Sequence, residues 1–403
     1  MLTKKVKIFV GLIVCLVFFW VGRSTFLYLT YETPPKISFD GINHNGYSKG
    51  VVPCTLKCES DYKLSNVDAF LDGKRVDVQE TKKISKASYE FLFDVDTLQL
   101  TDGKHSIEIN AKDSSYRHNN ISKKIDFTTD NVHLKSAFLQ PEYKIDQGHT
   151  IHVKINSNKP LSKAQLQVFS KAYECHRESE LSTVYECFIP VECEDVLGEH
   201  LLTAMLEDSP GNNLKLTSKV QIDSYKFPKQ RGFTVSKAKL EEDREVGISD
   251  KVFEDALVKW LAKSPKQKLW SGKFEMPINL KRIATPFGEV RMTPEKGRYI
   301  HKAVDVIDHP QSVVWASQKG RVIIKDRYVE AGNAVVLDHG LGIFSMYFHL
   351  EDFADIEIGD LVKKGKPLGK LGKTGYATGY HLHWEIRVNN VAINPLQWIE
   401  KNF

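Results

Sequence analysis

Two histidine-containing segments near the C-terminal end of the sequence have the composition and spacing of a metal site. In the first, His301 and Asp305 lie four residues apart, and the following run VDVID is typical of a strand. Residues at even spacing on a strand share one face, so we expect His301 and Asp305 on the same side. The small residue Ala303 between them would leave room for an ion.

The second segment reads HLHWEIRV from His381, with polar and apolar residues alternating over eight positions. This pattern predicts one half-buried strand, with His381 and His383 on the same face about 6 to 7 Å apart. An isolated H-x-H is more often a surface pair. Together with His301 and Asp305 on another strand, it predicts a mixed histidine and aspartate zinc site. Two histidines and one carboxylate leave a fourth position open, where a bound water ionises near neutral pH.

A third segment, Tyr347-Phe348-His349-Leu350, closes a further predicted strand, and His349 alone would be judged structural. With all three segments in order, residues 277–398 resemble the LytM and lysostaphin-type zinc endopeptidases. The resemblance rests on a series of short motifs in a fixed order: TPFG at 285–288, VR at 290–291, GN at 332–333, DHG at 338–340, YFHL at 347–350, GD at 359–360, KG at 364–365, Gly369, Gly372, TG at 374–375 and 378–379, HLHWE at 381–385, and NP at 394–395.

The resemblance implies roles for five side chains. His301, Asp305 and His383 would bind one zinc ion per chain. His349 and His381 would be the catalytic residues, orienting or deprotonating the zinc-bound water and stabilising the oxyanion, without a division of these roles. The chain departs from the family at Ala303, which stands where a glycine is usual. No ligand is lost, so we expect activity.

Other features of this segment are interpreted as structural. Gly372-Lys373-Thr374 looks like the end of a phosphate-binding loop, but Pro367 stands where its first glycine is required, which excludes a nucleotide site. His309 and His339 are left outside the predicted site.

The N-terminal residues indicate export. Three lysines precede an uncharged stretch at 8–22, whose 15 residues fit a signal-peptide core; residues 25–31 could complete a membrane crossing if Arg23 snorkels. No A-x-A cleavage site follows, so residues 1–31 are predicted to be a cytoplasmic tip and an uncleaved anchor, with a cleaved signal as the alternative. The bulk of the chain would then lie in the periplasm or cell-wall space.

Five cysteines follow this segment, an odd number, in a compartment where disulfides persist. Their spacing matches no zinc motif and favours a local hairpin staple within a group of three. The five are Cys54, Cys58, Cys175, Cys187 and Cys193.

The remaining sequence predicts a mainly β protein. Short alternating segments, with hairpin turns expected at Asp72-Gly73 and Asp102-Gly103, predict two tandem β-sandwich domains, at 32–130 and 131–230. They resemble bacterial immunoglobulin-like domains through DGKHSIEINAKD and GEHLLTAMLEDSPGN, and are interpreted as a spacer or a docking module for a protein partner. A helical linker at 231–270, with an amphipathic helix capped by Asp250 and ended by Ser264-Pro265, would pack between the second sandwich and an all-β zinc metallopeptidase domain at 271–403.

The net charge is +5, from 56 Lys and Arg against 51 Asp and Glu, so nucleic acid is not expected as a partner. The family resemblance and the export signal together imply a zinc-dependent endopeptidase that hydrolyses peptide cross-links or stem peptides of cell-wall peptidoglycan. The alternative is a non-enzymatic LytM-type scaffold that activates other wall hydrolases, which retention of all five site residues disfavours. An adhesion protein would leave the zinc residues unexplained.

Overall fold

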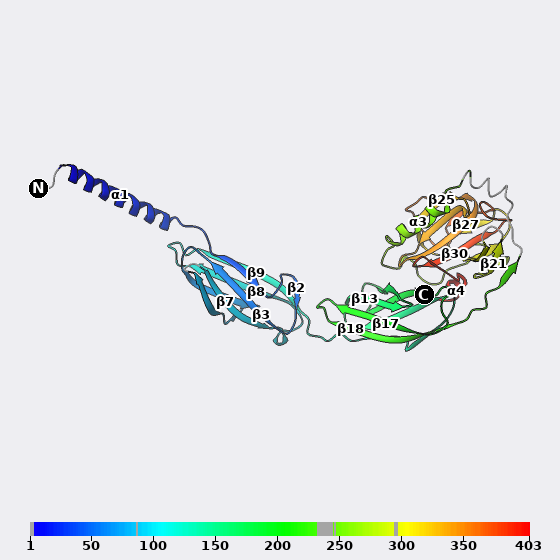
Figure 1. The fold of residues 1–403 in the computed structure, drawn as a ribbon, viewed down its shortest axis with the longest axis horizontal. Helices are drawn as coiled ribbons and strands as arrows, with labels where there is room; N and C mark the ends of the chain where they lie inside the picture. The colour runs from blue at the N-terminus through cyan, green and yellow to red at the C-terminus, as the bar shows by residue number, and fades with distance from the viewer. Residues whose placement is uncertain (1–3, 86–87, 232–244, 246, 294–296) are drawn as a thin grey trace. The chain divides into compact units, whose positions relative to one another are not determined.

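The computed structural model describes residues 4–85, 88–231, 245, 247–293 and 297–403. The described chain is mainly β, as predicted, and forms two compact units, Met1–His133 and Leu134–Phe403 (Figure 1).

Helix α1 (Lys4–Leu29) contains the predicted apolar segment. Its residues Phe9–Leu29 are long and apolar enough to cross a membrane, with a mean hydropathy of 2.0. At 1.5 Å per residue, 21 residues extend about 31 Å, close to the thickness of a bilayer core. The helix continues past Arg23 to Leu29. Its length therefore fits the predicted crossing that extends beyond Arg23 better than the 15-residue signal-peptide core at 8–22.

The first unit also contains two sheets that share one apolar core, which includes Leu56, Phe93, Ile107 and Phe127. One sheet has the order β1 (Lys36–Asp40), β3 (Val51–Glu59), β7 (Ser88–Asp96), β6 (Gln79–Ser85). The other has the order β2 (Gly46–Ser48), β9 (Asn120–Thr129), β8 (Gly103–Asp113), β4 (Leu64–Leu71), β5 (Lys74–Val76).

The two predicted hairpin turns of this unit have different outcomes. Asp72 and Gly73, with φ of 50° and 78°, join the antiparallel pair β4 and β5, so this prediction is confirmed. The prediction at Asp102-Gly103 is wrong. This turn follows β7 and the 3-10 helix η1 (Thr97–Gln99) and leads to β8, which lies in the other sheet.

The second unit begins with another pair of sheets around a core that includes Ile155, Leu166, Ala204 and Ile222. One has the order β10 (Ser136–Phe138), β12 (Thr150–Ser157), β16 (Val184–Pro190), β15 (His176–Arg177). The other has the order β11 (Glu142–Asp146), β18 (Asn213–Asp223), β17 (Gly198–Asp208), β13 (Leu161–Val168), β14 (Lys171–Glu174). The immunoglobulin-like assignment and the four boundaries between domains stay predictions.

The C-terminal part of the second unit is built on a large sheet, whose central strands position the candidate site. Its main order is β20 (Arg282–Thr285), β23 (Val304–Ile307), β30 (Leu382–Val388), β27 (Ile343–Phe353), β26 (Gly332–Asp338), β25 (Gly320–Tyr328), β28 (Leu361–Val362). Strands β24 (Val313–Trp315), β29 (Pro367–Leu371) and β31 (Val391–Ile393) pair off this path, and helix α4 (Leu396–Glu400) follows. A separate small sheet joins β19 (Lys229–Arg231), β21 (Val290–Thr293) and β22 (Gly297–Ile300).

The predicted amphipathic helix is α3 (Asp250–Leu261). Its N-cap is Ser249, whose side chain accepts a hydrogen bond from the Lys251 amide, so the prediction of Asp250 as the cap is wrong. Phe253 and Leu257 are buried in a core that this helix shares with β25, β26 and β27. Figure 1 shows α3 beside the C-terminal sheet. The helix therefore packs on the C-terminal sheet.

The second pair of sheets is joined to the C-terminal sheet by buried contacts. Phe188 of β16 belongs to the same core as Trp270 and Trp398, at ring-centroid distances of 5.8 Å from each. The side chain of Gln397 accepts from the Thr150 amide at 2.7 Å and donates to the Thr150 carbonyl at 3.0 Å. These contacts explain why residues 134–403 form one compact unit.

Candidate metal centre

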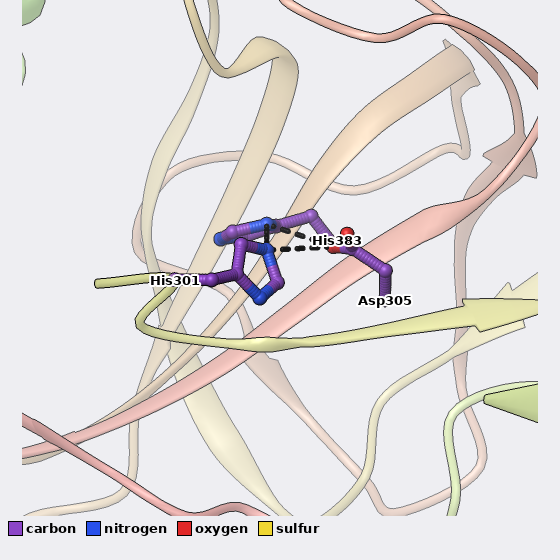
Figure 2. Close-up of side chains that lie close together, drawn as sticks. All are labelled: His301, Asp305 and His383. Atoms are coloured by element: carbon purple, nitrogen blue, oxygen red, sulfur yellow. Dashed lines mark hydrogen bonds and ion pairs between the residues drawn. The ribbon is translucent and has the colours of Figure 1, made fainter. Parts of the chain in front are cut away.

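The side chains of His301, Asp305 and His383 point toward one another (Figure 2). Oδ1 of Asp305 lies 3.0 Å from Nε2 of His301 and 3.1 Å from Nδ1 of His383. The two nitrogens are 3.2 Å apart. Asp305 on β23 and His383 on β30 are register partners in an antiparallel pair, so the backbone itself brings them together.

His301 reaches this cluster because the chain bends before β23. Had residues 301–305 formed one straight strand, as predicted, the two ends would lie about 13 Å apart, too far for one ion. Instead β22 ends at Ile300 and β23 begins at Val304. Hydrogen bonds from the His301 amide to the Glu289 carbonyl and from the Gly288 amide to the His301 carbonyl hold His301 at the bend. The predicted pairing is therefore present, but the predicted strand geometry is wrong.

The three donors fit a tetrahedrally bound divalent metal. Ligand atoms at zinc bond lengths of 2.0–2.1 Å are separated by about 3.3 Å in a tetrahedron, close to the separations of 3.0–3.2 Å here. Nδ1 of His301 is buried and has no hydrogen-bond partner among the described residues, so the contacts of this ring with the cluster run through Nε2. Ala303, at the position of the family's glycine, is fully buried next to the bend.

The charges of the cluster also suit a cation. Burial lowers the pKa of His301, which favours the neutral, ligating imidazole. Burial alone would raise the pKa of Asp305, but the charge and hydrogen bond of His301 hold it well below its usual range. For His383, burial favours the neutral form, yet the carboxylates of Asp305 and Glu385 raise its pKa to about 9. A bound metal would displace the proton from this ring.

The two remaining predicted residues lie beside the cluster. The ring centroids of His349 and His381 are 4.8 Å apart, and that of His349 is 5.7 Å from that of His383. Nδ1 of His349 bonds to the Thr374 carbonyl at 2.8 Å, and Nδ1 of His381 bonds to the Gly379 carbonyl at 2.9 Å. Since a carbonyl only accepts, Nδ1 of each ring carries a proton, so Nε2 is the atom of each ring that can exchange a proton with a reacting group.

The backbone conformation and the pKa of His349 are both unusual. Its φ is +62°, a left-handed conformation that costs energy for a residue with a side chain. Burial, together with the neighbouring His381 and His383, holds its pKa well below the usual value, so this imidazole is neutral. The structure thus brings all five predicted side chains to one place.

Sequence reasoning missed the residues that surround the ligands. Glu385 is buried, with Oε2 3.7 Å from Nε2 of His383 and Oε1 2.5 Å from Nε of Arg387. Although burial opposes its ionisation, the charge of Arg387 lowers the pKa of Glu385 to about 2. The alternation in HLHWEIRV places Glu385 and Arg387 on the same face of the strand as His383. This pattern was the signal in the sequence that could have identified them. The prediction of a half-buried strand was wrong, because β30 lies between β23 and β27 and is buried on both faces.

Arg291 contacts the proposed ligand Asp305, as Glu385 contacts His383. Its Nη2 lies 3.5 Å from Oδ2 of Asp305 and donates to Oγ1 of Thr285 at 2.7 Å, while its Nε donates to Glu289 at 2.9 Å. The guanidinium holds the outer oxygen of the carboxylate and leaves Oδ1 toward the two histidines. Such contacts orient metal ligands and raise their affinity.

The cluster opens into a cleft of ≈ 540 Å³. Besides the five predicted residues, the cleft is lined by aromatic and polar side chains, among them Arg282, Tyr299, Glu330, Tyr376, Thr378 and Tyr380. A concave site with several polar groups is suited to binding a ligand next to the cluster.

Residues 299–395 match the model of Peptidase family M23. Over 121 residues the chain is 37% identical to the DD-carboxypeptidase/endopeptidase Mpg of Neisseria meningitidis serogroup B, covering 30% of this chain and 27% of that protein. It is 33% identical over 121 residues to the peptidoglycan DD-endopeptidase ShyC of Vibrio cholerae, covering 30% and 28%.

A solved structure of a peptidase M23 from Pseudomonas aeruginosa aligns over 64% of this chain and 95% of that one, with 22% identity and a TM-score of 0.44. The match to the two curated relatives above spans about a quarter of their length. The sequence-based resemblance is confirmed for the segment that carries the five side chains: the C-terminal part of this chain contains a LytM-type domain of Peptidase family M23.

Proposed function

We propose that this chain is a zinc-dependent endopeptidase that hydrolyses peptide cross-links of cell-wall peptidoglycan. The observation that carries the proposal is the convergence of the His301, Asp305 and His383 donors at tetrahedral spacing, next to two further histidines whose Nε2 atoms can exchange a proton. The names of the M23 relatives, which include peptidoglycan DD-endopeptidases, support the substrate class.

In the proposed reaction His301, Asp305 and His383 hold the ion, and Arg291 and Glu385 orient two of these ligands. Zinc, when bound, supplies a Lewis acid that acidifies water and polarises the scissile carbonyl. His349 or His381 accepts the proton of the attacking water at Nε2. Once protonated it donates this proton to the leaving amine, while its Nδ1 proton stays on the backbone carbonyl.

The location of the activity follows from α1. We propose that this helix anchors the chain in the cytoplasmic membrane with its basic end inside, so that the M23 domain acts in the periplasm or cell-wall space. The two pairs of sheets that follow α1 would then lie on the wall side of the membrane, where they could meet a protein partner.

The test uses the full chain in detergent, loaded with zinc, on purified peptidoglycan. One preparation has D-amino-acid cross-links and another has glycine bridges, and the released fragments are identified by mass spectrometry. We expect new peptide ends from wild type, none from His383→Ala, and wild-type release from His309→Ala, which removes an exposed histidine of the same domain. A chain that binds zinc but releases no fragment from either wall would contradict the enzyme and favour the scaffold.

A further inference from the structure

Helix α3 lies outside the segment that matches the M23 family, yet it lines the cleft through Asp250, Phe253 and Glu254. Contacts from two of these residues lead, by separate paths, to the same side chain, His383. One path is polar and the other is aromatic.

The polar path begins with a two-pronged ion pair. Oε2 and Oε1 of Glu254 accept hydrogen bonds from Nη1 and Nη2 of Arg387 at 2.9 and 3.0 Å. This fork geometry fixes the plane of the guanidinium. Nε of the same guanidinium donates to Glu385 at 2.5 Å, and the other oxygen of Glu385 lies 3.7 Å from Nε2 of His383. Glu254 therefore holds the guanidinium of Arg387 in place, and Arg387 in turn holds Glu385 next to the proposed ligand His383.

The aromatic path begins with Phe253, which is buried against the sheet. Its ring meets Phe348 edge to face, with centroids 5.4 Å apart. Phe348 is stacked on the imidazole of His383, at 5.2 Å and an interplanar angle of 5°. One face of the His383 ring therefore rests on a side chain that α3 supports.

The start of α3 also contacts the segment that supports His349. Oδ1 of Asp250 accepts from the Glu330 amide at 3.0 Å. The carbonyl of the next residue, Ala331, accepts from the His349 amide at 2.9 Å. The helix is thus attached close to both a proposed ligand and a proposed catalytic residue.

We propose that α3 is a positioning element of the metal centre, and that Glu254 is a positioning residue that orients His383 through Arg387 and Glu385. The inference rests on the proposed function, since His383 is assigned there as a ligand. The side chain of Glu254 is 51% exposed. The side chain of Arg387 is 11% exposed, and it keeps its ion pair with Glu385 when Glu254 is replaced, so we expect the effect of this contact at the ligand rather than in the stability of the fold.

The test compares full-length Glu254→Gln with Asp255→Asn. Asp255 is the next acidic residue of the same helix, but it pairs with Lys251 at 2.6 Å on the exposed side, which makes it a matched control. Three quantities are measured for each protein: the zinc dissociation constant in competition with a chromogenic chelator, the d–d absorption spectrum of the cobalt-substituted protein, and the melting temperature of the zinc-free protein.

Loss of a residue in contact with a ligand typically weakens metal binding about 10- to 100-fold, and Glu254 acts through two intervening side chains. We therefore expect Glu254→Gln to weaken zinc binding by about threefold to tenfold and to shift the cobalt spectrum, with a melting temperature equal to that of Asp255→Asn. Glu254→Asp, which keeps one carboxylate oxygen within reach of Arg387, should recover part of the affinity.

Two results would overturn the assignment. If Glu254→Gln and Asp255→Asn bind zinc equally and share the wild-type cobalt spectrum, α3 only covers the sheet. If Glu254→Gln lowers the melting temperature and leaves zinc affinity unchanged, its role is structural. Failure of wild type to bind zinc would instead refute the proposed function, and the positioning role with it; failure of wild type to cleave the wall leaves the zinc measurements valid.

Discussion

Asp305 and His383 are register partners on β23 and β30, and Oδ1 of the one lies 3.1 Å from Nδ1 of the other. Strand pairing therefore determines two of the three donors, and a one-residue slip of β30 would turn His383 to the opposite face. The third donor, His301, depends on a bend outside the strand. Two of the proposed ligands, Asp305 and His383, therefore lie on strands of a buried sheet, and the third, His301, lies in the short connection between β22 and β23.

Zinc content is expected to follow this arrangement. Wild type should bind one zinc ion, and His383→Ala, Asp305→Ala and His301→Ala should each lose it, whereas His309→Ala should not. Elemental analysis of the purified full chain measures the ratio. Affinity should fall as the solution is acidified, because the ligands bind in deprotonated form. Stoichiometric zinc in the His383→Ala protein would show that the ligand set is wrong.

Replacing the two neighbouring histidines should separate binding from catalysis. His349→Ala and His381→Ala remove Nε2 atoms that can exchange a proton but none of the three donors, so zinc content should stay near wild type. Hydrolysis should fall by about 100-fold or more, the usual effect of losing general-base or oxyanion assistance. Measurements of zinc content and of hydrolysis rate for each variant check these two expectations. Unchanged rates would remove these residues from the site, and loss of zinc in both would contradict the division of roles.

The five side chains that the sequence singles out lie together in the structure, and short motifs in a fixed order carry them; their roles stay predictions. The sequence did not predict how His301 reaches Asp305, since alternation describes a straight strand and not a bend. It also missed the ion pairs of Arg291 and of Glu254 with Arg387. The latter joins residues 133 positions apart, and no local pattern encodes such a contact.

Buried His339 should make stability depend on pH. Its Nδ1 donates to the Lys319 carbonyl and its Nε2 bonds to the Ser345 hydroxyl, each at 2.7 Å. Burial lowers its pKa to about 4, against about 6.5 in an unfolded chain. Between these values the unfolded state binds a proton that the folded state does not. The contribution of His339 is therefore complete above pH ~6.5 and is lost as the pH falls toward ~4, by at most about 3 kcal/mol at 1.36 kcal/mol per pH unit.

The measurement is chemical unfolding followed by tryptophan fluorescence, to which the buried Trp270, Trp384 and Trp398 contribute, with a chelator present so that zinc release does not contribute. His339→Gln should be less stable than wild type at pH 7.5 and should lose less stability between pH 6.5 and 4.5. His309→Gln, an exposed histidine, is the control and should follow wild type. Equal slopes for wild type and His339→Gln would refute the assignment.

The predicted hairpin staple has one good candidate pair. All six cysteines are thiols in the structure. His176 pairs with Glu186 and Arg177 with Tyr185, so Cys175 and Cys187 lie just beyond the last pair of this antiparallel ladder. Their side chains interact, and both are buried. Opposed residues there have Cα atoms about 4.5 to 5.5 Å apart, within the range for a disulfide. Cys54 and Cys58, four residues apart on β3, are too distant to join each other.

We expect Cys175 and Cys187 to form a disulfide in the exported protein, giving two protons and two electrons to a disulfide-bearing oxidase. Peptide mapping by mass spectrometry without reductant should find this link and a thiol at Cys193. Closing a loop of this size contributes about 3 kcal/mol, so Cys175→Ala should lower the melting temperature of the oxidised protein and not of the reduced one. Recovery of only unlinked thiols would contradict the prediction.

The contacts between the second pair of sheets and the C-terminal sheet bear on whether the N-terminal half restrains the enzyme. A fragment beginning at Lys273 would lose α3 and Phe188, whose ring contacts Trp398, so we expect it to be unstable and to bind zinc weakly.

A fragment of residues 134–403 keeps one whole compact unit. It should melt at the temperature of the corresponding transition in the full chain and cleave the same soluble wall peptide within about twofold, below one kcal/mol of barrier. A much faster 134–403 fragment would indicate that the first unit covers the cleft, and a stable, fully active fragment from Lys273 would show that the buried contacts with Phe188 and α3 are dispensable.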